Sequence, residues 1–106
     1  MRRLLPLLLL CRLATAGEIP NYQNPHGRAQ PVIAVVGYNT GTELTDFAIP
    51  YGVLARSGAA QVLAVATQDG ALTMRPALRI QPQDTIAGFD RRFPDGADYV
   101  IVPAVG

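Results

Sequence analysis

The sequence predicts an α/β fold built on a parallel sheet. Two observations support this prediction: three short, continuously apolar segments rich in β-branched residues, and an amphipathic helical pattern between the first two. Continuously apolar strands are typical of parallel sheets, because both faces of such sheets are covered. A strand, a helix and a second strand within about 36 residues form a βαβ unit, whose strands run parallel.

The first predicted strand is Val32–Gly37, and a turn over residues 37–41 leads into the helix. The spacing Thr40-x-x-Glu43 predicts a capping box, in which the Thr hydroxyl accepts the amide of residue 43 and the Glu reaches back to the cap. The apolar stripe of the helix repeats at spacings of three and four, and its members are Leu44, Phe47, Ala48, Tyr51, Leu54 and Ala55.

Two residues predict how this helix is interrupted and where it ends. Pro50 has no amide hydrogen and its ring clashes with the carbonyl of residue 46, so we expect a kink or a short first turn that restarts at Pro50. Gly58 follows Arg56 and Ser57, and it is placed to end the helix in the left-handed conformation.

The rest of the body is predicted from shorter patterns. Residues 61–67 form the second strand, Leu72–Arg75 and residues 77–80 a small hairpin around Pro76, and residues 99–102 the third strand. Residues 82–96 are mixed, with Ile86, Phe89 and Phe93 as anchors. One strong helix leaves one face of a parallel sheet largely uncovered, so we expect a domain truncated after about three core strands. The alternative is a short protein that forms a homodimer to cover its sheet.

The pattern of residues 1–16 predicts an export leader. Arg2 and Arg3 precede an apolar run at residues 4–11, and Ala14-Thr15-Ala16 provides the cleavage site. The alternatives are an N-terminal extension or a start codon placed too far upstream. Removal of the leader takes away Cys11, the only cysteine. The protein is then periplasmic or extracellular; without a leader it is cytoplasmic. Residues 17–31 are polar and broken by prolines, which is typical of a linker.

The charge balance argues against two classes of partner. Without the three Arg of the first 12 residues, six Arg stand against eight acids. A mildly acidic body lacks the positive surface that nucleic acid requires, so we expect no nucleic acid partner. It also lacks a basic amphipathic segment for a membrane surface, so no membrane contact is expected after leader removal.

Asp46 is the acidic residue that the sequence favours most for a functional role. It follows the first strand early in the helix, at the carboxyl edge where open α/β sheets bind ligands. Its structural alternative is interaction with the helix dipole, which contributes about 0.3–1 kcal/mol. The sequence has no P-loop, HExxH, CxxC or GxSxG motif, and Gly37-x-x-x-Gly41 is not a dinucleotide fingerprint. We therefore expect no cofactor and no metal.

Residues 41–54, GTELTDFAIPYGVL, resemble the first helix motif of the ThiJ/PfpI superfamily, whose domain is class I glutamine amidotransferase-like. They are most similar to the branch with the pattern E-L-x-D-x-x-x-P-x-x-V-L, which includes isocyanide-hydratase-like proteins and amidase-like domains of AraC-type regulators. The resemblance spans residues 31–106, including the order of strands, helix and hairpin. It implies a flavodoxin-like three-layer sandwich.

The resemblance also implies a role for Asp46. In the family, the acid four residues before the proline forms a hydrogen bond with a cysteine nucleophile. This bond tunes the ionisation of the thiol. That cysteine would follow Gly106, so the chain lacks the nucleophile. Pro103-Ala104-Val105 replaces the family's Pro-Gly-Gly, which puts the usual backbone contribution to an oxyanion site in doubt.

The sequence therefore leaves three alternative functions. The first is an inactive N-terminal fragment of a cysteine-dependent hydrolase or hydratase-like enzyme that acts on a small molecule. The second is a non-catalytic domain that senses a small ligand, as in AraC-type regulators, although an exported protein cannot reach a promoter. The third is a structural module that is stable only as a dimer.

Overall fold

The computed structural model describes residues 17–106. The predicted export leader, with Cys11 in it, lies outside the described residues. Within residues 17–106, no helix has the length and apolar character needed to cross a membrane.

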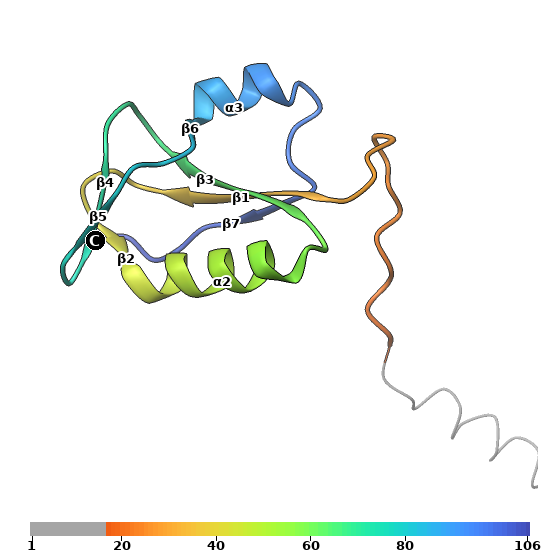
Figure 1. Ribbon diagram of the computed structural model, residues 1–106, viewed down its shortest axis with the longest axis horizontal. Coiled ribbons are helices and arrows are strands. Elements are labelled where there is room, and N and C mark those ends of the chain that lie inside the picture. Colours follow the sequence, from red (N-terminus) through yellow and green to blue (C-terminus); the bar gives the residue numbers. More distant parts are fainter. Residues whose placement is uncertain (1–16) are drawn as a thin grey trace, which may run out of the picture.

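A parallel four-stranded sheet with the order β6-β3-β1-β7 lies at the centre of the fold (Figure 1). The strand β1 (Val32–Gly37) pairs with β3 (Gln61–Ala66) on one edge and with β7 (Tyr99–Ile101) on the other. The two-residue strand β6 (Asp84–Thr85) extends the sheet beyond β3. The α/β fold and its three principal strands are confirmed.

Two helices cover the opposite faces of this sheet (Figure 1). Next to α2 (Leu44–Ser57), the buried side chains are Val35, Phe47, Ala64, Ala66, Leu72 and Met74. Next to α3 (Ile86–Arg92), they are Val32, Ala34, Leu63, Val65 and Phe89. Successive strand residues point to opposite faces, so β1 and β3 contribute to both clusters. The expectation of one largely uncovered face is therefore wrong for β1 and β3.

The helix α3 was missed because it carries almost no pattern. It has seven residues and a single buried one, Phe89, so an apolar stripe with a period of 3.6 residues has no length in which to repeat. Its start is fixed by Thr85, whose hydroxyl accepts the amide of Gly88 at 3.1 Å. Ile86, also expected as an anchor, is 41% exposed.

The start of α2 differs from the predicted capping box. The N-cap is Glu43, whose carboxylate accepts the amide of Asp46 at 2.8 Å. Thr40 does not cap the helix, because residues 42 and 43 stay extended as the strand β2 (Thr42–Glu43), which pairs with β4. Strand pairing therefore delays the start of the helix and leaves the glutamate in the cap position.

Pro50 lies inside a helix that runs unbroken from Leu44 to Ser57, so the predicted restart at this residue is wrong. Because Pro50 cannot donate, the carbonyl of Asp46 lacks its usual partner in the helix. Gly58 ends the helix with φ 69°, which confirms the predicted left-handed conformation.

A second, three-stranded sheet has the order β2-β4-β5. The strands β4 (Leu72–Arg75) and β5 (Leu78–Ile80) pair in antiparallel fashion and form the predicted hairpin. Leu72 and Met74 point from β4 into the core below α2. The small sheet thus closes the core at one end of the helix.

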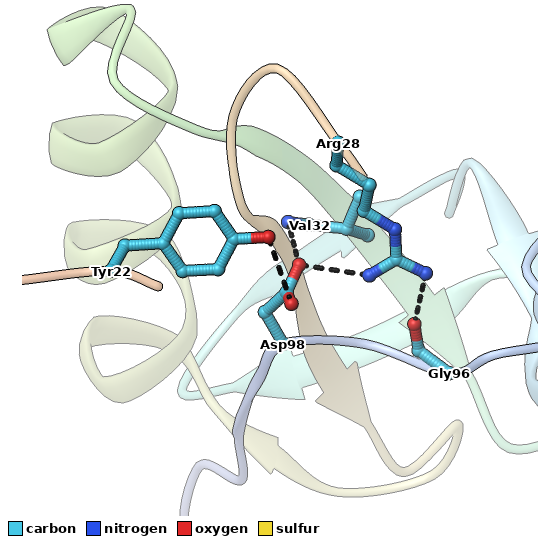
Figure 2. A network of polar contacts seen from close by, with 5 residues as sticks. All are labelled: Tyr22, Arg28, Val32, Gly96 and Asp98. Carbon is cyan, nitrogen blue, oxygen red and sulfur yellow. Dashed lines mark hydrogen bonds and ion pairs between the residues drawn. The ribbon is translucent and has the colours of Figure 1, made fainter. Parts of the chain in front are cut away.

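The carboxylate of Asp98 joins the N-terminal segment to the start of the sheet (Figure 2). One of its oxygens accepts the amide of Val32 and the guanidinium of Arg28, each at 2.8 Å, and the other accepts the hydroxyl of Tyr22 at 3.1 Å. Arg28 also donates to the carbonyl of Gly96 at 2.6 Å. Residues 17–31 contain no helix or strand, yet two of their side chains bind a carboxylate that is 3% exposed.

These partners change the ionisation of Asp98. The Val32 amide, the guanidinium of Arg28 and the hydroxyl of Tyr22 favour the anion, and together they hold the pKa of Asp98 below its ordinary value although desolvation opposes them. A carboxylate with a lowered pKa in the folded state stabilises the fold above its unfolded pKa, and this contribution is lost as the pH falls through the folded pKa.

Replacement of Phe47 by Ala tests the core below α2. Phe47 is 1% exposed, so we expect a loss of about 3–5 kcal/mol in the free energy of unfolding, or an unfolded chain. Thr73→Ala, at an exposed position of β4, should stay within about 0.5 kcal/mol of the wild type. Urea unfolding followed by circular dichroism measures both. A loss below about 1 kcal/mol for Phe47→Ala would contradict this core.

The pH dependence of stability tests the Asp98 network. The free energy of unfolding should be level from neutral pH to about pH 5 and then fall as the pH drops through about 3.9, the ordinary pKa of Asp, toward the lower folded pKa. Asp98→Asn should be less stable at pH 7 and should show a smaller fall in acid. Asp95→Asn, at an exposed position nearby, is the control. An equal acid fall in wild type and Asp98→Asn would contradict the network.

Candidate functional site

An open hollow of about 450 Å³ lies between the first turns of α2 and the end of β7. We call it the α2–β7 hollow, and its lining residues are Thr45, Asp46, Ile49, Pro50, Ile101, Val102 and Pro103. It lies at the carboxyl edge of the parallel sheet, where ligands bind in folds of this type. Most of its lining is apolar, and Asp46 is its one charged side chain.

Asp46 lies at this carboxyl edge, exposed to solvent, as its place in the sequence predicts. One of its carboxylate oxygens accepts the backbone amide of Ala104 at 3.2 Å. Its own amide donates to Glu43 at the start of the helix. Asp46 therefore connects α2 with the segment after β7, and its second oxygen makes no protein hydrogen bond within the described residues.

Glu43 has a structural role, because it caps the start of α2. The hydroxyl of Thr45 donates to its carboxylate at 2.6 Å, and the amide of Asp46 donates to the same oxygen at 2.8 Å. These two bonds, with the positive charge of Arg75, lower the pKa of Glu43. The carboxylate of Glu43 is occupied by Thr45 and the helix start. Asp46 is therefore the acid that lines the hollow.

The segment after β7 has little backbone left to offer a ligand. The amide of Ala104 is bound by Asp46, and the carbonyl of Ala104 accepts the amide of Glu43 at 2.9 Å. The amide of Gly106 donates to the carbonyl of Gly41 at 3.2 Å. The amides that follow Pro103 are thus partly engaged within the protein.

The loops next to the hollow are held by a buried asparagine that sequence reasoning missed. Asn39 is 5% exposed, and its amide nitrogen donates to the carbonyl of Gln68 at 2.9 Å. Its oxygen accepts the hydroxyl of Thr67 and the amide of Gln68, at 2.9 and 3.0 Å. This side chain joins the turn after β1 to the loop after β3 at the carboxyl edge of the sheet. Its position in a Tyr-Asn-Thr-Gly turn was the one available signal.

Among the described residues, no cysteine lies at the hollow, and the one hydroxyl in its lining, that of Thr45, donates to Glu43. No Cys, Ser or His side chain lines the hollow, and His26 is exposed in the segment before β1. Among residues 17–106, no group of three or more His, Cys, Asp or Glu side chains is placed to hold a metal ion. What the hollow offers is one carboxylate beside an apolar surface.

No protein-family model matches this chain, and no curated protein matches it.

Two substitutions of Asp46 test its bond to Ala104. In Asp46→Ala the Ala104 amide loses its acceptor, so its hydrogen exchange should be roughly two- to tenfold faster, which corresponds to a net bond of about 0.5–1.5 kcal/mol. Asp46→Asn keeps an oxygen at the same place and should exchange at nearly the wild-type rate. Exchange measured by NMR distinguishes them, and equal rates in all three proteins would contradict the bond.

Proposed function

We propose that this chain is the N-terminal part of a ThiJ/PfpI-like domain, in which Asp46 is the partner acid of a cysteine that would follow Gly106. The intact form would be a cysteine-dependent hydrolase or hydratase-like enzyme that acts on a small molecule. The chain of residues 1–106 would be inactive, because no cysteine lines the hollow beside Asp46.

The observation that supports the proposal is the position of the Asp46 carboxylate. It borders an open, apolar hollow at the carboxyl edge of a parallel sheet, the place where such sheets bind ligands. One oxygen is fixed by Ala104 and the other has no protein partner within residues 17–106. A carboxylate held in this way has a free lone pair with a defined direction.

The chemistry of a thiol explains what such an acid contributes. The thiolate is the nucleophilic form of cysteine, and it predominates only where the surroundings favour the loss of the proton. A carboxyl group within hydrogen-bond reach can take the thiol proton and return it later in the reaction. The apolar side chains of Ile49, Pro50 and Ile101 would lie beside that exchange.

A ligand-sensing domain without catalysis is the second candidate. Its support is the same hollow, which is mostly apolar, open and, within the described residues, lined by no cysteine. Such a surface binds a small apolar molecule without reacting with it. The predicted leader argues against a DNA-binding regulator, so this candidate concerns ligand binding alone.

The coding sequence after codon 106 tests the proposal first. A reading frame that encodes an apolar strand followed by Cys-x-Gly would support the enzyme, and a helix-turn-helix pair would support the regulator. If neither follows and residues 1–106 unfold cooperatively as a stable protein, the proposal is wrong.

In a protein that carries that cysteine, Asp46→Asn tests the partner acid. An amide cannot exchange a proton with the thiol, so we expect activity to fall by about 10²–10⁴-fold and the pKa of the thiol to rise. The pH dependence of alkylation by iodoacetamide measures that pKa. Glu43→Gln is the control, because Glu43 binds the helix start and its loss should leave the thiol unchanged. An unchanged thiol in Asp46→Asn would leave Asp46 with a structural role only.

A further inference from the structure

The segment of residues 17–30 is attached to the domain through two side chains. Every residue of the segment is exposed except Tyr22 and Arg28, which are partly buried. Both bind the carboxylate of Asp98, whose side chain is 3% exposed (Figure 2). No backbone hydrogen bond joins residues 17–30 to the other described residues. A single carboxylate therefore holds the segment, and a segment with so few contacts detaches at a lower free energy than the domain unfolds.

The guanidinium of Arg28 is the more firmly bound of the two attachments. One of its nitrogens donates to Asp98 at 2.8 Å and another donates to the carbonyl of Gly96 at 2.6 Å. The guanidinium also lies over the ring of Phe93, 5.7 Å from the ring centroid, which is within the range of a cation–π interaction. Phe93 packs in turn against Phe89 of α3. The domain thus binds Arg28 through two nitrogens and through the face of an aromatic ring.

The position of Arg28 in the chain is typical of a protease substrate. Within residues 17–106 it is the one arginine that lies in neither a helix nor a strand, and the chain has no lysine. Residues 23–27 and 29–30, on either side of it, are exposed, and proteases cut preferentially in such exposed, irregular segments. A protease of trypsin-like specificity binds the basic side chain in a pocket that carries a carboxylate. Here Asp98 already occupies the guanidinium that the protease has to bind.

We propose that the peptide bond between Arg28 and Ala29 is a latent processing site, which Asp98 closes to arginine-specific proteases by holding the Arg28 guanidinium. The protease and Asp98 compete for the same group, so the site opens only when the segment detaches from the domain. Water then hydrolyses the peptide bond, which leaves a carboxylate on Arg28 and an amino group on Ala29. The cut removes the residues up to 28 and leaves β1 intact. The inference goes beyond the proposed function, since Asp46 has no part in it.

Trypsin digestion of the chain of residues 1–106 under native conditions tests the site, and mass spectrometry measures how fast the fragment that begins at Ala29 appears. Asp98→Asn keeps the shape of the side chain but loses the ion pair, so we expect the fragment at least about tenfold faster than in the wild type. Tyr22→Phe removes one hydrogen bond at the other attachment, and the fragment should appear about two- to tenfold faster. Asp95→Asn, exposed in the same turn as Asp98, is the control and should match the wild type.

The other cuts distinguish a detached segment from an unfolded domain. They follow the arginines that lie in helices or in β5, which are Arg56, Arg79, Arg91 and Arg92. Equal rates of the Ala29 fragment in the wild type, Tyr22→Phe and Asp98→Asn would overturn the inference. Cuts at these four arginines that rise in step with the cut at Arg28 in both variants would also overturn it, because Asp98 would then protect the whole fold. If Asp98→Asn does not fold, Tyr22→Phe alone decides.

Discussion

The burial of β1 on both faces and both edges is the constraint on which the rest of the fold depends. Val35 is fully buried between the sheet and α2, while Val32 and Ala34 face α3. A buried strand needs partners for every amide and carbonyl. β3 meets this need along the whole of β1, and β7 along three residues. At its first residue the side chain of Asp98 accepts the remaining amide, which ties the N-terminal segment into the fold.

The carboxyl edge of the sheet differs from one strand to the next. Above β1 and β3 the buried side chain of Asn39 joins the turn after β1 to the loop after β3. Toward β7 the edge stays open, and Asp46 faces an apolar hollow there. The proposed function concerns the residues that follow β7, because the Ala104 amide donates to Asp46.

The extent to which the sequence predicted the fold depends on how local each signal is. The three principal strands, the stripe around Phe47 and the glycine that ends α2 were predictable, since neighbouring residues determine them. The start of α2 was not, because β2 pairs with β4, about thirty residues away. Asp46 could be placed at the carboxyl edge from strand and helix order alone. Its partner Ala104 could not, because the two residues are 58 positions apart.

By itself, the sequence determined the periodic elements: apolar runs that require burial on two faces, and a helix with one apolar stripe. The tertiary structure alone decided which polar residues matter. Asp98 binds Tyr22 and Arg28 across 76 and 70 positions, and Glu43 became a helix cap because a strand held it extended. The physical reason is that a hydrogen bond depends on distance in space, and such pairs leave no periodic trace in the order of residues.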